Sequence, residues 1–258
     1  MLESLLFGAI ASAALVLGAL IGGWVQLPKR LLAAMLAFAA GALITALAFE
    51  LFEDSYEQGG LWRAALGLLA GAVVFTFVSQ WLDRRAEAGA PEDHGSSKLD
   101  ADAPASDAAA SQASRGGAAG LALLAAVTLD GVPENVALGV SLGEGTGGLA
   151  LLAAIFVSNF PEALVGSASM RAQGRSQAFV VGTWTVCALL LTAAVVVGAG
   201  PLAAAEGHTL SLPLAFAAGA VLASLADTLM PEAYEQGGPV VALSTAAGFV
   251  LSFYLATL

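Results

Sequence analysis

The feature that most constrains this chain is a series of apolar runs, each long enough to cross a lipid bilayer as a helix. A helix needs about 20 apolar residues to cross a hydrocarbon core of about 30 Å. Only 11% of the residues are charged and the mean hydropathy is +0.83, so charges are too few to cover a water-soluble globule. We therefore predict an all-α membrane protein with eight transmembrane helices, at residues 4–25, 31–52, 61–82, 117–141, 147–170, 177–200, 209–231 and 239–257.

Residues 83–116 differ in composition from the rest of the chain. The stretch is rich in Ala, Asp, Ser and Gly and contains two prolines. Such a sequence cannot bury enough apolar surface to offset the entropy of ordering it. We expect a disordered cytoplasmic loop here, between transmembrane helices 1–3 in residues 1–82 and helices 4–8 in residues 117–258.

The basic residues predict the orientation of the helices. If the loops alternate between the two sides, all but one of the nine Lys and Arg residues lie on one side, and only Arg63 lies on the other. Lys and Arg collect in cytoplasmic loops, so both termini are expected outside the cytoplasm. The first apolar run lacks a basic segment before it and is expected to stay in the membrane. The eight residues on the cytoplasmic side are Lys29, Arg30, Arg84, Arg85, Lys98, Arg115, Arg171 and Arg175.

An internal repeat relates the two ends of the chain. Residues 37–60 read AFAAGALITALAFELFEDSYEQGG and residues 215–238 read AFAAGAVLASLADTLMPEAYEQGG, with 14 of 24 positions identical. The copies end helices two and seven, which cross the membrane in opposite directions. This is the pattern of an inverted-topology repeat, which many transporters use for alternating access. We expect helices 1–3 to repeat as helices 6–8 around a central pair, helices 4 and 5.

The central pair carries the rare charges within the spans, which usually mark functional sites. Helix four contains LDGVPENVALG and helix five contains SNFPEALVGS, and each has a Pro-Glu pair. Asp130 and Glu134 share one helix face, as do Ser158 and Glu162, with Asn159 three residues before Glu162. Each proline removes a backbone hydrogen bond, which frees the carbonyl four residues earlier to act as an oxygen donor.

Three carboxylates near mid-membrane cannot all stay ionised without a cation. Carboxylate, amide and carbonyl oxygens suit Mn²⁺, Mg²⁺, Fe²⁺ or Zn²⁺. A divalent ion held by Asp130, Glu134, Asn159 and Glu162 is one interpretation. A proton path through Glu134 and Glu162, serving a proton-linked carrier of another substrate, is the alternative, and a kinked helix with a hydrogen-bonded acid is a third.

Other features narrow the functional class. A net charge of −11 gives no support for nucleic-acid binding. Cys187 is the only cysteine and is expected to be a small core residue, and no arrangement of nucleophile and base indicates an enzyme. Glu50 and Asp227 lie near equivalent positions late in helices two and seven. They are either interfacial acids or vestibule acids that attract cations toward the site.

In these motifs the sequence resembles the ZIP (Zrt/Irt-like) family of metal transporters, over essentially its whole length. That family has eight helices, a variable loop after helix three and Pro-Glu motifs on helices four and five. FAAGAL in helix two and FAAGAV with MPEAYEQ in helix seven are similar to its bacterial branch. The resemblance implies a metal site between helices four and five, a homodimer in the bacterial inner membrane, and an elevator-like motion of helices one, four, five and six.

The sequence departs from the family at several site positions. The family histidine falls on Asp130 and the family asparagine on Gly131, while Asn135 replaces a glycine after Pro-Glu and could supply an amide. Helix six has no acid to complete a second metal site. Loss of the imidazole shifts the ligand set toward oxygen. We expect a permease that takes a divalent cation such as Zn²⁺, Mn²⁺ or Fe²⁺ into the cytoplasm as its substrate, with no prosthetic group; a non-transporting protein on the same scaffold is a further alternative.

Overall fold

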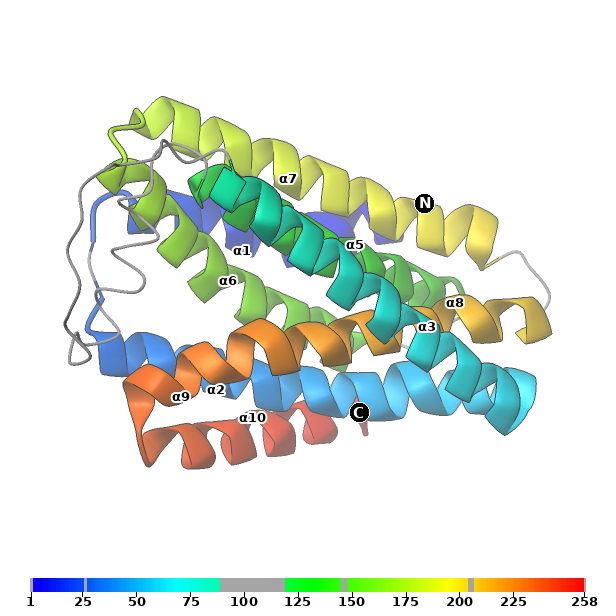
Figure 1. Cartoon of the computed structure of the whole chain (residues 1–258). Coiled ribbons are helices and arrows are strands. Elements are labelled where there is room, and N and C mark those ends of the chain that lie inside the picture. The colour runs from blue at the N-terminus through cyan, green and yellow to red at the C-terminus, as the bar shows by residue number, and fades with distance from the viewer. Residues whose placement is uncertain (1, 26, 89–118, 145–147, 204–206, 258) are drawn as a thin grey trace.

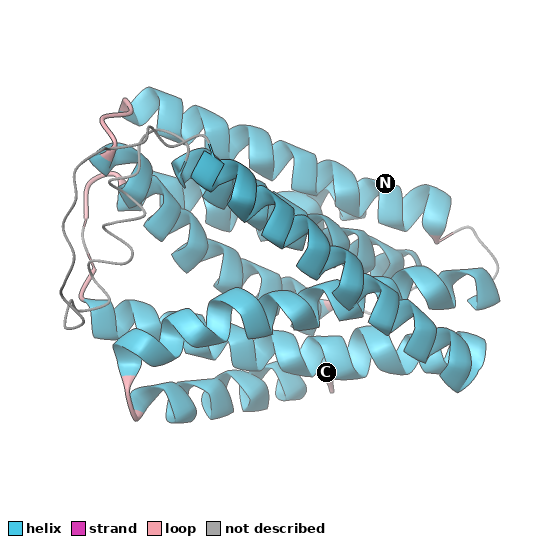
Figure 2. Ribbon diagram, in the orientation of Figure 1, coloured by secondary structure: helices cyan, strands magenta, loops and turns pink. Residues whose placement is uncertain are grey.

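Helices account for every regular element in the described part of the chain, and no strand is found there (Figure 2). The computed structural model describes residues 2–25, 27–88, 119–144, 148–203 and 207–257. The elements are α1 (Leu2–Gly22), α2 (Lys29–Ala46), η1 (Leu47–Phe52), α3 (Glu53–Ala88), α5 (Ala119–Glu144), α6 (Leu149–Ala172), α7 (Gln177–Val197), η2 (Gly198–Leu202), α8 (Gly207–Ser224), η3 (Leu225–Leu229), α9 (Met230–Gly237) and α10 (Val240–Ala256), where η denotes a π-helix.

The prediction of an all-helical membrane protein is confirmed at this level. Within the described residues, five helical stretches are long and apolar enough to cross a membrane, and α10 is a shorter apolar helix of 17 residues. One of the five stretches, Lys29–Trp81, has 53 residues. At a rise of 1.5 Å per residue, a straight helix of this length would extend about 80 Å, far more than one bilayer core. The backbone departs from helical geometry at Gly60, with φ 75° and ψ 171°, and α3 then runs back along the bundle (Figure 1).

The predicted loop differs from the structure at its start. Helix α3 continues to Ala88, so residues 83–88 are helical although the composition indicated a loop from residue 83. The helix extends because AEA, the last three residues before the Gly-rich segment, are good helix formers. The remainder of the predicted loop, residues 89–116, lies outside the described residues.

The helices pack as two groups. In the first group, α1 packs against α6 and α7, and α5 packs against α7 and η2. In the second group, α3 packs against α8, and α2 packs against α10 and α9. The groups also pack against each other, because α6 contacts α2 and α10, and α5 contacts α8 and α3. Figure 1 shows the first group in the upper part of the view and α2, α8, α9 and α10 in the lower part, with α3 crossing in front.

Glycines bring backbones into direct contact inside each group. A Cβ added at Gly22 of α1 would lie 2.3 Å from a carbonyl oxygen of α6, and one at Gly139 of α5 would lie 2.1 Å from a carbonyl oxygen of α7. In the second group, a Cβ added at Gly41 would lie 2.0 Å from a carbonyl oxygen of α10, and one added at Gly219 would lie 1.9 Å from a carbonyl oxygen of α3. Small residues allow this close packing where lipid supplies no hydrophobic driving force. Among the described glycines, every such close contact stays within one group.

Side chains fill the seam between the two groups. The larger buried cluster joins Leu36, Leu43 and Val221 of the second group to Leu138 and Ile155 on the facing sides of α5 and α6. A smaller cluster lies wholly within the first group, around Trp184. The outer surfaces remain strongly apolar, with Leu66, Phe77 and Leu243 each more than 60% exposed. Such a surface is suited to lipid rather than water.

Candidate functional site

Helices α5 and α6 each contain a proline in mid-helix, Pro133 and Pro161, and each proline is followed by a glutamate. A proline has no N–H and therefore leaves the carbonyl four residues earlier without its helical donor. The two helices pack against each other, and both are enclosed by other helices of the bundle. The predicted site therefore lies on two helices in each of which the proline deprives one carbonyl of its helical donor.

Glu134 and Asn135 follow Pro133 and are both buried, at 5% and 0% exposure. Asn135 Nδ2 donates a hydrogen bond of 2.8 Å to the carbonyl oxygen of Gly131, one turn earlier. Its Oδ1 is buried and has no hydrogen-bond partner. An unpaired buried polar atom costs about 1–3 kcal/mol, which a cation or other ligand would offset.

Gly131, where the resemblance to ZIP transporters would place an asparagine, is a packing position in this chain. A Cβ at Gly131 would lie 2.8 Å from the side chain of Leu191 on α7. The glycine therefore lets α7 approach α5 closely and supplies no side-chain ligand. The amide of Asn135, one turn further along the helix, is the polar group that α5 offers beside Glu134.

On α6, the polar residues before Pro161 are buried among the other helices. Ser158 is 1% exposed, and its hydroxyl donates a hydrogen bond of 3.1 Å to the carbonyl oxygen of Ile155. Asn159 is 2% exposed, and its Nδ2 has no hydrogen-bond partner. A half-turn about χ2 exchanges the amide nitrogen and oxygen, so Asn159 can present either atom at this position. Each proline-containing helix thus carries one buried amide with an unsatisfied atom.

Glu162 is half-buried and lies within electrostatic range of the Cys187 thiol on α7. Cys187 is free and buried, as expected for a core residue, and its sulfur lies 3.4 Å from the hydroxyl of Thr128 on α5. A thiol is a softer metal ligand than a carboxylate. The position of Cys187 between α5 and α6 could not be read from the sequence, where it stands in an ordinary apolar run.

The described side chains do not include all of the predicted ligands. Asp130 lies in α5, but its side chain is outside the described part of the structure. Among the side chains that are described, no three from His, Cys, Asp and Glu are arranged to hold a metal ion. The carboxylate trio of Asp130, Glu134 and Glu162 therefore stays a prediction.

Glu50 lies in the π-helix η1 and lines a cavity of about 330 Å³ at one end of the bundle. Glu53 and Asp54 line the same cavity, together with residues of the α5–α6 junction and of α10. The Oε2 atom of Glu50 accepts a hydrogen bond of 3.2 Å from the backbone N–H of Leu151 in α6. This carboxylate is therefore held at the cavity wall and not in the region of the Pro-Glu pairs.

Asp227 lies in the other repeat copy, in the π-helix η3, and is exposed. It accepts a hydrogen bond of 3.2 Å from the hydroxyl of Ser79 on α3. Glu50 and Asp227, which lie near equivalent positions of the two repeat copies, are thus both in π-helical segments. Such segments are rare and are often found at functional sites.

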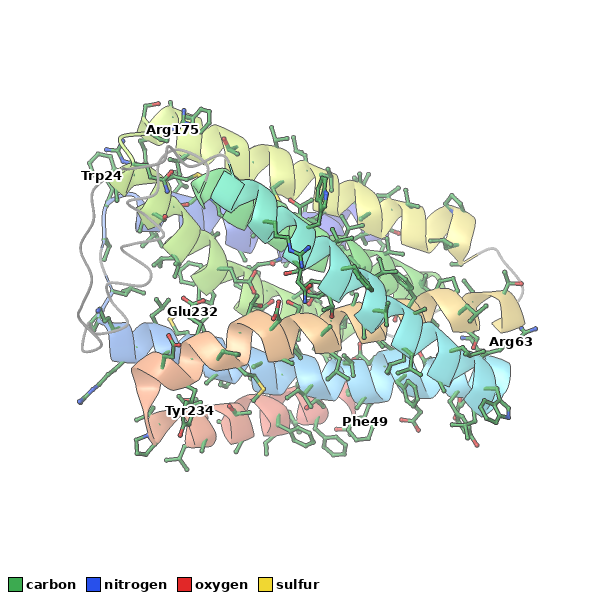
Figure 3. All side chains as sticks on the ribbon, in the orientation of Figure 1. Trp24, Phe49, Arg63, Arg175, Glu232 and Tyr234 are labelled. Carbon is green, nitrogen blue, oxygen red and sulfur yellow. The ribbon has the colours of Figure 1, made fainter. Side chains whose placement is uncertain are left out.

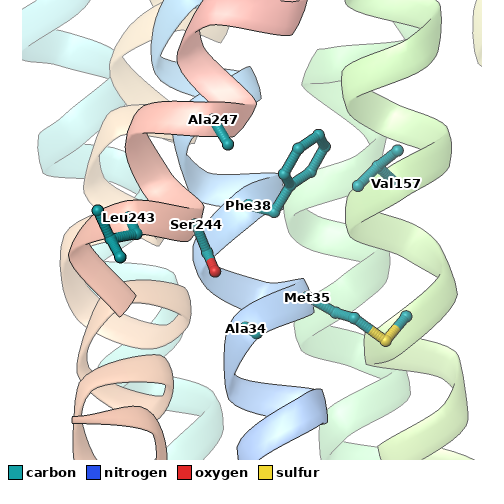
Figure 4. A pocket seen from close by; sticks show the side chains of 7 residues that line it. All are labelled: Ala34, Met35, Phe38, Val157, Leu243, Ser244 and Ala247. Carbon is teal, nitrogen blue, oxygen red and sulfur yellow. The ribbon is translucent and has the colours of Figure 1, made fainter. Parts of the chain in front are cut away.

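A second cavity, of about 400 Å³, lies between α2, α6 and α10 (Figure 4). Its lining includes Met35, Phe38, Val157 and Leu243 and contains no charged side chain. Ser244 is its one hydroxyl-bearing residue. The chemistry of this cavity suits an apolar occupant and not a cation.

Comparison with known proteins adds no assignment. No protein-family model matches the chain, and no curated protein matches it.

Proposed function

We propose that this protein carries a divalent metal cation across a membrane, with the ion bound between α5 and α6. The observation that carries the proposal is the pair of buried amides, Asn135 and Asn159, each with an unsatisfied polar atom and each beside a Pro-Glu pair. Polar groups at membrane depth are costly and are retained for function. Oxygen atoms from these amides, from Glu134 and Glu162, and from the free carbonyls form a ligand set that suits a hard or borderline cation.

Asp130 completes the proposed site as a third carboxylate. With Asp130 at the position where the ZIP family has histidine, the ligands are mostly oxygen, and Cys187, within electrostatic range of Glu162, is a soft donor on the neighbouring helix α7. The ion sheds most of its water, binds among these groups and leaves on the other side after the helices rearrange. The ion is the transported substrate, and no covalent chemistry is involved.

Alternating access rests on the inverted repeat, and the packing of the two copies supports it. Gly41 and Gly219 occupy aligned positions in the two copies. The backbone at Gly41 lies against the carbonyl of Thr245, and the backbone at Gly219 lies against the carbonyl of Leu68. The π-helices η1 and η3 also begin at aligned positions, Leu47 and Leu225. These matching contacts are what two symmetry-related halves would give, with α1–α3 corresponding to α7, α8 and α10.

Eight membrane spans follow from the same correspondence. The stretch Lys29–Trp81 supplies two spans, broken at Gly60, and α5 and α10 supply two more. The basic residue Arg63 lies at the opposite end of the bundle from Arg175, as the positive-inside rule requires of two loops on different sides (Figure 3). Both termini are then extracytoplasmic, and we place the protein in a bacterial inner membrane as a homodimer that imports its cation.

The two helix groups provide the moving parts. Backbone contacts at glycines hold each group together, whereas the seam between the groups is formed at the described positions by side-chain packing and by the hydrogen bond from the Leu151 N–H to Glu50. Side-chain interfaces slide more readily than interlocked backbones, because rotamers can adjust. Movement of α1, α5, α6 and α7 against the second group would carry the bound ion.

Uptake of Mn²⁺ into proteoliposomes tests the proposal. Purified full-length protein should take up Mn²⁺ in a saturable manner, and Glu134→Gln and Glu162→Gln should each reduce the rate at least about tenfold, because each removes a charged ligand. Glu57→Gln, at an exposed position outside the proposed site, is the matched control and should retain uptake. Proton flux without any metal requirement would support a proton-linked carrier instead. Correctly folded protein without flux of either kind would indicate a non-transporting role.

A further inference from the structure

The two repeat copies end in matching helical segments at opposite ends of the bundle. In the first copy, residues 53–59 follow the π-helix η1 and lead to Gly60, and in the second copy α9 follows the π-helix η3 and leads to Gly238. Both glycines have a positive φ, 75° at Gly60 and 57° at Gly238, so each segment ends where the backbone leaves helical geometry. Figure 1 shows α9 at the end of the bundle where α2 begins and the start of α3 at the other end.

The two segments also pack against equivalent neighbours. A Cβ added at Gly59 would lie 2.1 Å from the hydroxyl oxygen of Ser211 on α8. A Cβ added at the aligned Gly237 would lie 3.0 Å from the Cβ of Ala33 on α2. In the same register of the repeat, Ser211 and Ala33 are themselves aligned. Each segment therefore rests on its neighbouring helix at the same point, with a glycine at the contact.

In the first copy, this contact is fastened by two serines, Ser55 and Ser211, which we call the serine clasp. The hydroxyl of Ser55 donates a hydrogen bond of 2.7 Å to the carbonyl oxygen of Ser211, and the hydroxyl of Ser211 donates one of 2.8 Å to the carbonyl oxygen of Ser55. Both serines are 0% exposed. Separating residues 53–59 from α8 would break both bonds away from water, where an unpaired polar group is costly.

The second copy lacks this clasp. The positions aligned with the two serines are Ala233 of α9 and Ala33 of α2, which are equally buried, and their methyl groups form no hydrogen bond. A backbone bond is lost as well. In the first copy the N–H of Glu53 donates to the carbonyl of Ala48, whereas the aligned Pro231 has no N–H. Both differences weaken the attachment of α9 relative to its counterpart.

We propose that α9 is a gate that swings away from α2, while the equivalent segment at the other end, residues 53–59, is held closed on α8 by the serine clasp. Segments held by fewer hydrogen bonds open at a lower free energy than the rest of a fold. The π-helix η3 and Gly238 bound the moving segment, and α2 supplies the surface from which it separates. The gate thus opens at one end of the bundle only.

The direction of the gate rests on the proposed function. Glu232 and Tyr234 of α9 lie at the same end of the bundle as Arg175, and Arg63 lies at the opposite end (Figure 3). The positive-inside rule then places α9 at the cytoplasmic side, where an importer releases its cation. Helix α2 packs against both α9 and α6, so withdrawal of α9 removes one of the contacts that hold α2 beside α6.

Hydrogen–deuterium exchange of the full chain in detergent tests the gate without relying on transport. Protection factors are compared between residues 53–59 and the aligned α9, which corrects for differences in intrinsic exchange rate. We expect the α9 amides to be at least about tenfold less protected, since the clasp supplies two buried hydrogen bonds that α9 lacks. Equal protection of the two segments would overturn the proposal.

Moving the clasp from one copy to the other identifies its role. Ala33→Ser with Ala233→Ser should raise the protection of α9 toward that of residues 53–59, because the helices already lie in contact there. Ala34→Ser is the matched control, since this residue lines the apolar cavity between α2, α6 and α10 and should leave α9 unchanged. Unchanged protection of α9 in the folded double variant would refute the gate.

Removal of the clasp provides the reciprocal test. Ser55→Ala with Ser211→Ala should reduce the protection of residues 53–59 to about that of α9. Melting temperatures show whether each variant folds. If the variant with added serines does not fold, the variant without the clasp decides the outcome alone, and unchanged protection of residues 53–59 would then refute the proposal.

Mn²⁺ uptake by the same variants distinguishes failure of the gate from failure of the proposed function. The variant with serines at positions 33 and 233 should take up Mn²⁺ about tenfold more slowly than the parent, and Ala34→Ser should match the parent. Full uptake by the variant whose α9 has become protected would overturn the gate and leave transport intact. A parent protein that shows the expected exchange pattern and moves no metal would refute the proposed function and leave the mobility of α9 established.

Discussion

At the scale of single residues, the candidate site is defined by buried polar side chains that have fewer hydrogen-bond partners than they could take. Asn135 and Asn159 each retain a polar atom without a partner, although the helices around them are closely packed. Leucine at either position would cost less free energy in a purely structural role. We infer that these amides are kept for a ligand.

Replacement of Asn135 by leucine separates stability from function. The variant removes the unsatisfied Oδ1 and gives up one local hydrogen bond to Gly131, so the melting temperature should stay the same or rise. Uptake of Mn²⁺ should fall, because one oxygen donor beside Glu134 is lost. Thermal unfolding in detergent and uptake in proteoliposomes measure the two effects. A variant that is less stable and fully active would show that the amide is structural.

The identity of residue 130 should determine the preferred metal. Asp130→His introduces an imidazole, which suits Zn²⁺ better than a carboxylate does, so the preference should move from Mn²⁺ toward Zn²⁺. Competition between Zn²⁺ and labelled Mn²⁺ during uptake measures the change. An unaltered ranking of metals would count against Asp130 as a ligand.

Removal of the Cys187 thiol should shift the metal preference away from soft ions, by less than the change at residue 130. Cys187→Ser keeps a hydroxyl for Thr128 and removes the soft donor, so inhibition of uptake by Cd²⁺ should weaken while Mn²⁺ uptake persists. The competition assay used for residue 130 provides the comparison. Equal Cd²⁺ inhibition in both proteins would mean that the thiol stays outside the site.

At the scale of helices, glycine positions decide which elements can interlock. The aligned glycines Gly41 and Gly219 allow α2 to lie against α10 and α8 to lie against α3, with no room for a side chain. The π-helices η1 and η3 follow these contacts at the same distance in both copies. Equivalent sequence therefore produces equivalent packing at two places in the bundle.

A side chain at Gly41 should disrupt this packing. Gly41→Val forces methyl groups into a contact where a Cβ alone would already lie 2.0 Å from the carbonyl oxygen of Thr245, and overpacking of this kind costs about 1–3 kcal/mol. The melting temperature in detergent should drop clearly. Gly182→Val is the matched control, because no atom lies within 4 Å of a Cβ there. Equal stability of the two variants would contradict the packing argument.

Sequence patterns predicted the helical elements closely and the site only in part. The apolar runs give the helix positions to within a few residues, because the length of a membrane span is set by the bilayer. The runs could not reveal that α3 continues to Ala88 or that helices two and seven contain π-helical turns, since these depend on packing. Spacing indicated that Glu134 shares a helix with Asp130. It could not indicate that Glu50 caps α6 or that Cys187 lies within electrostatic range of Glu162, because both interactions join residues far apart in the chain.

At the scale of the whole molecule, the account combines two interlocked helix groups with an acid-lined cavity at one end of their seam. The glycine contacts within the groups and the side-chain packing between them favour movement of one group as a unit. The amides and glutamates of α5 and α6 belong to the first group, so a cation held there would travel with it.

The two repeat copies should face opposite sides of the membrane. Single cysteines replacing Glu57 and Glu235, which occupy aligned positions in the copies, should react with an impermeant maleimide from opposite sides of sealed vesicles. Labelling before and after the vesicles are opened gives the sidedness of each position. Reaction of both cysteines from the same side would contradict the inverted arrangement and the count of eight spans.

The most direct test of the account is a crystal structure of the protein with Mn²⁺, in which anomalous scattering locates the metal. We predict an anomalous peak between α5 and α6, within bonding distance of carboxylate oxygens from both Glu134 and Glu162. A structure in which these two carboxylates lie too far apart to share an ion, or in which the metal binds only elsewhere, would contradict the assignment.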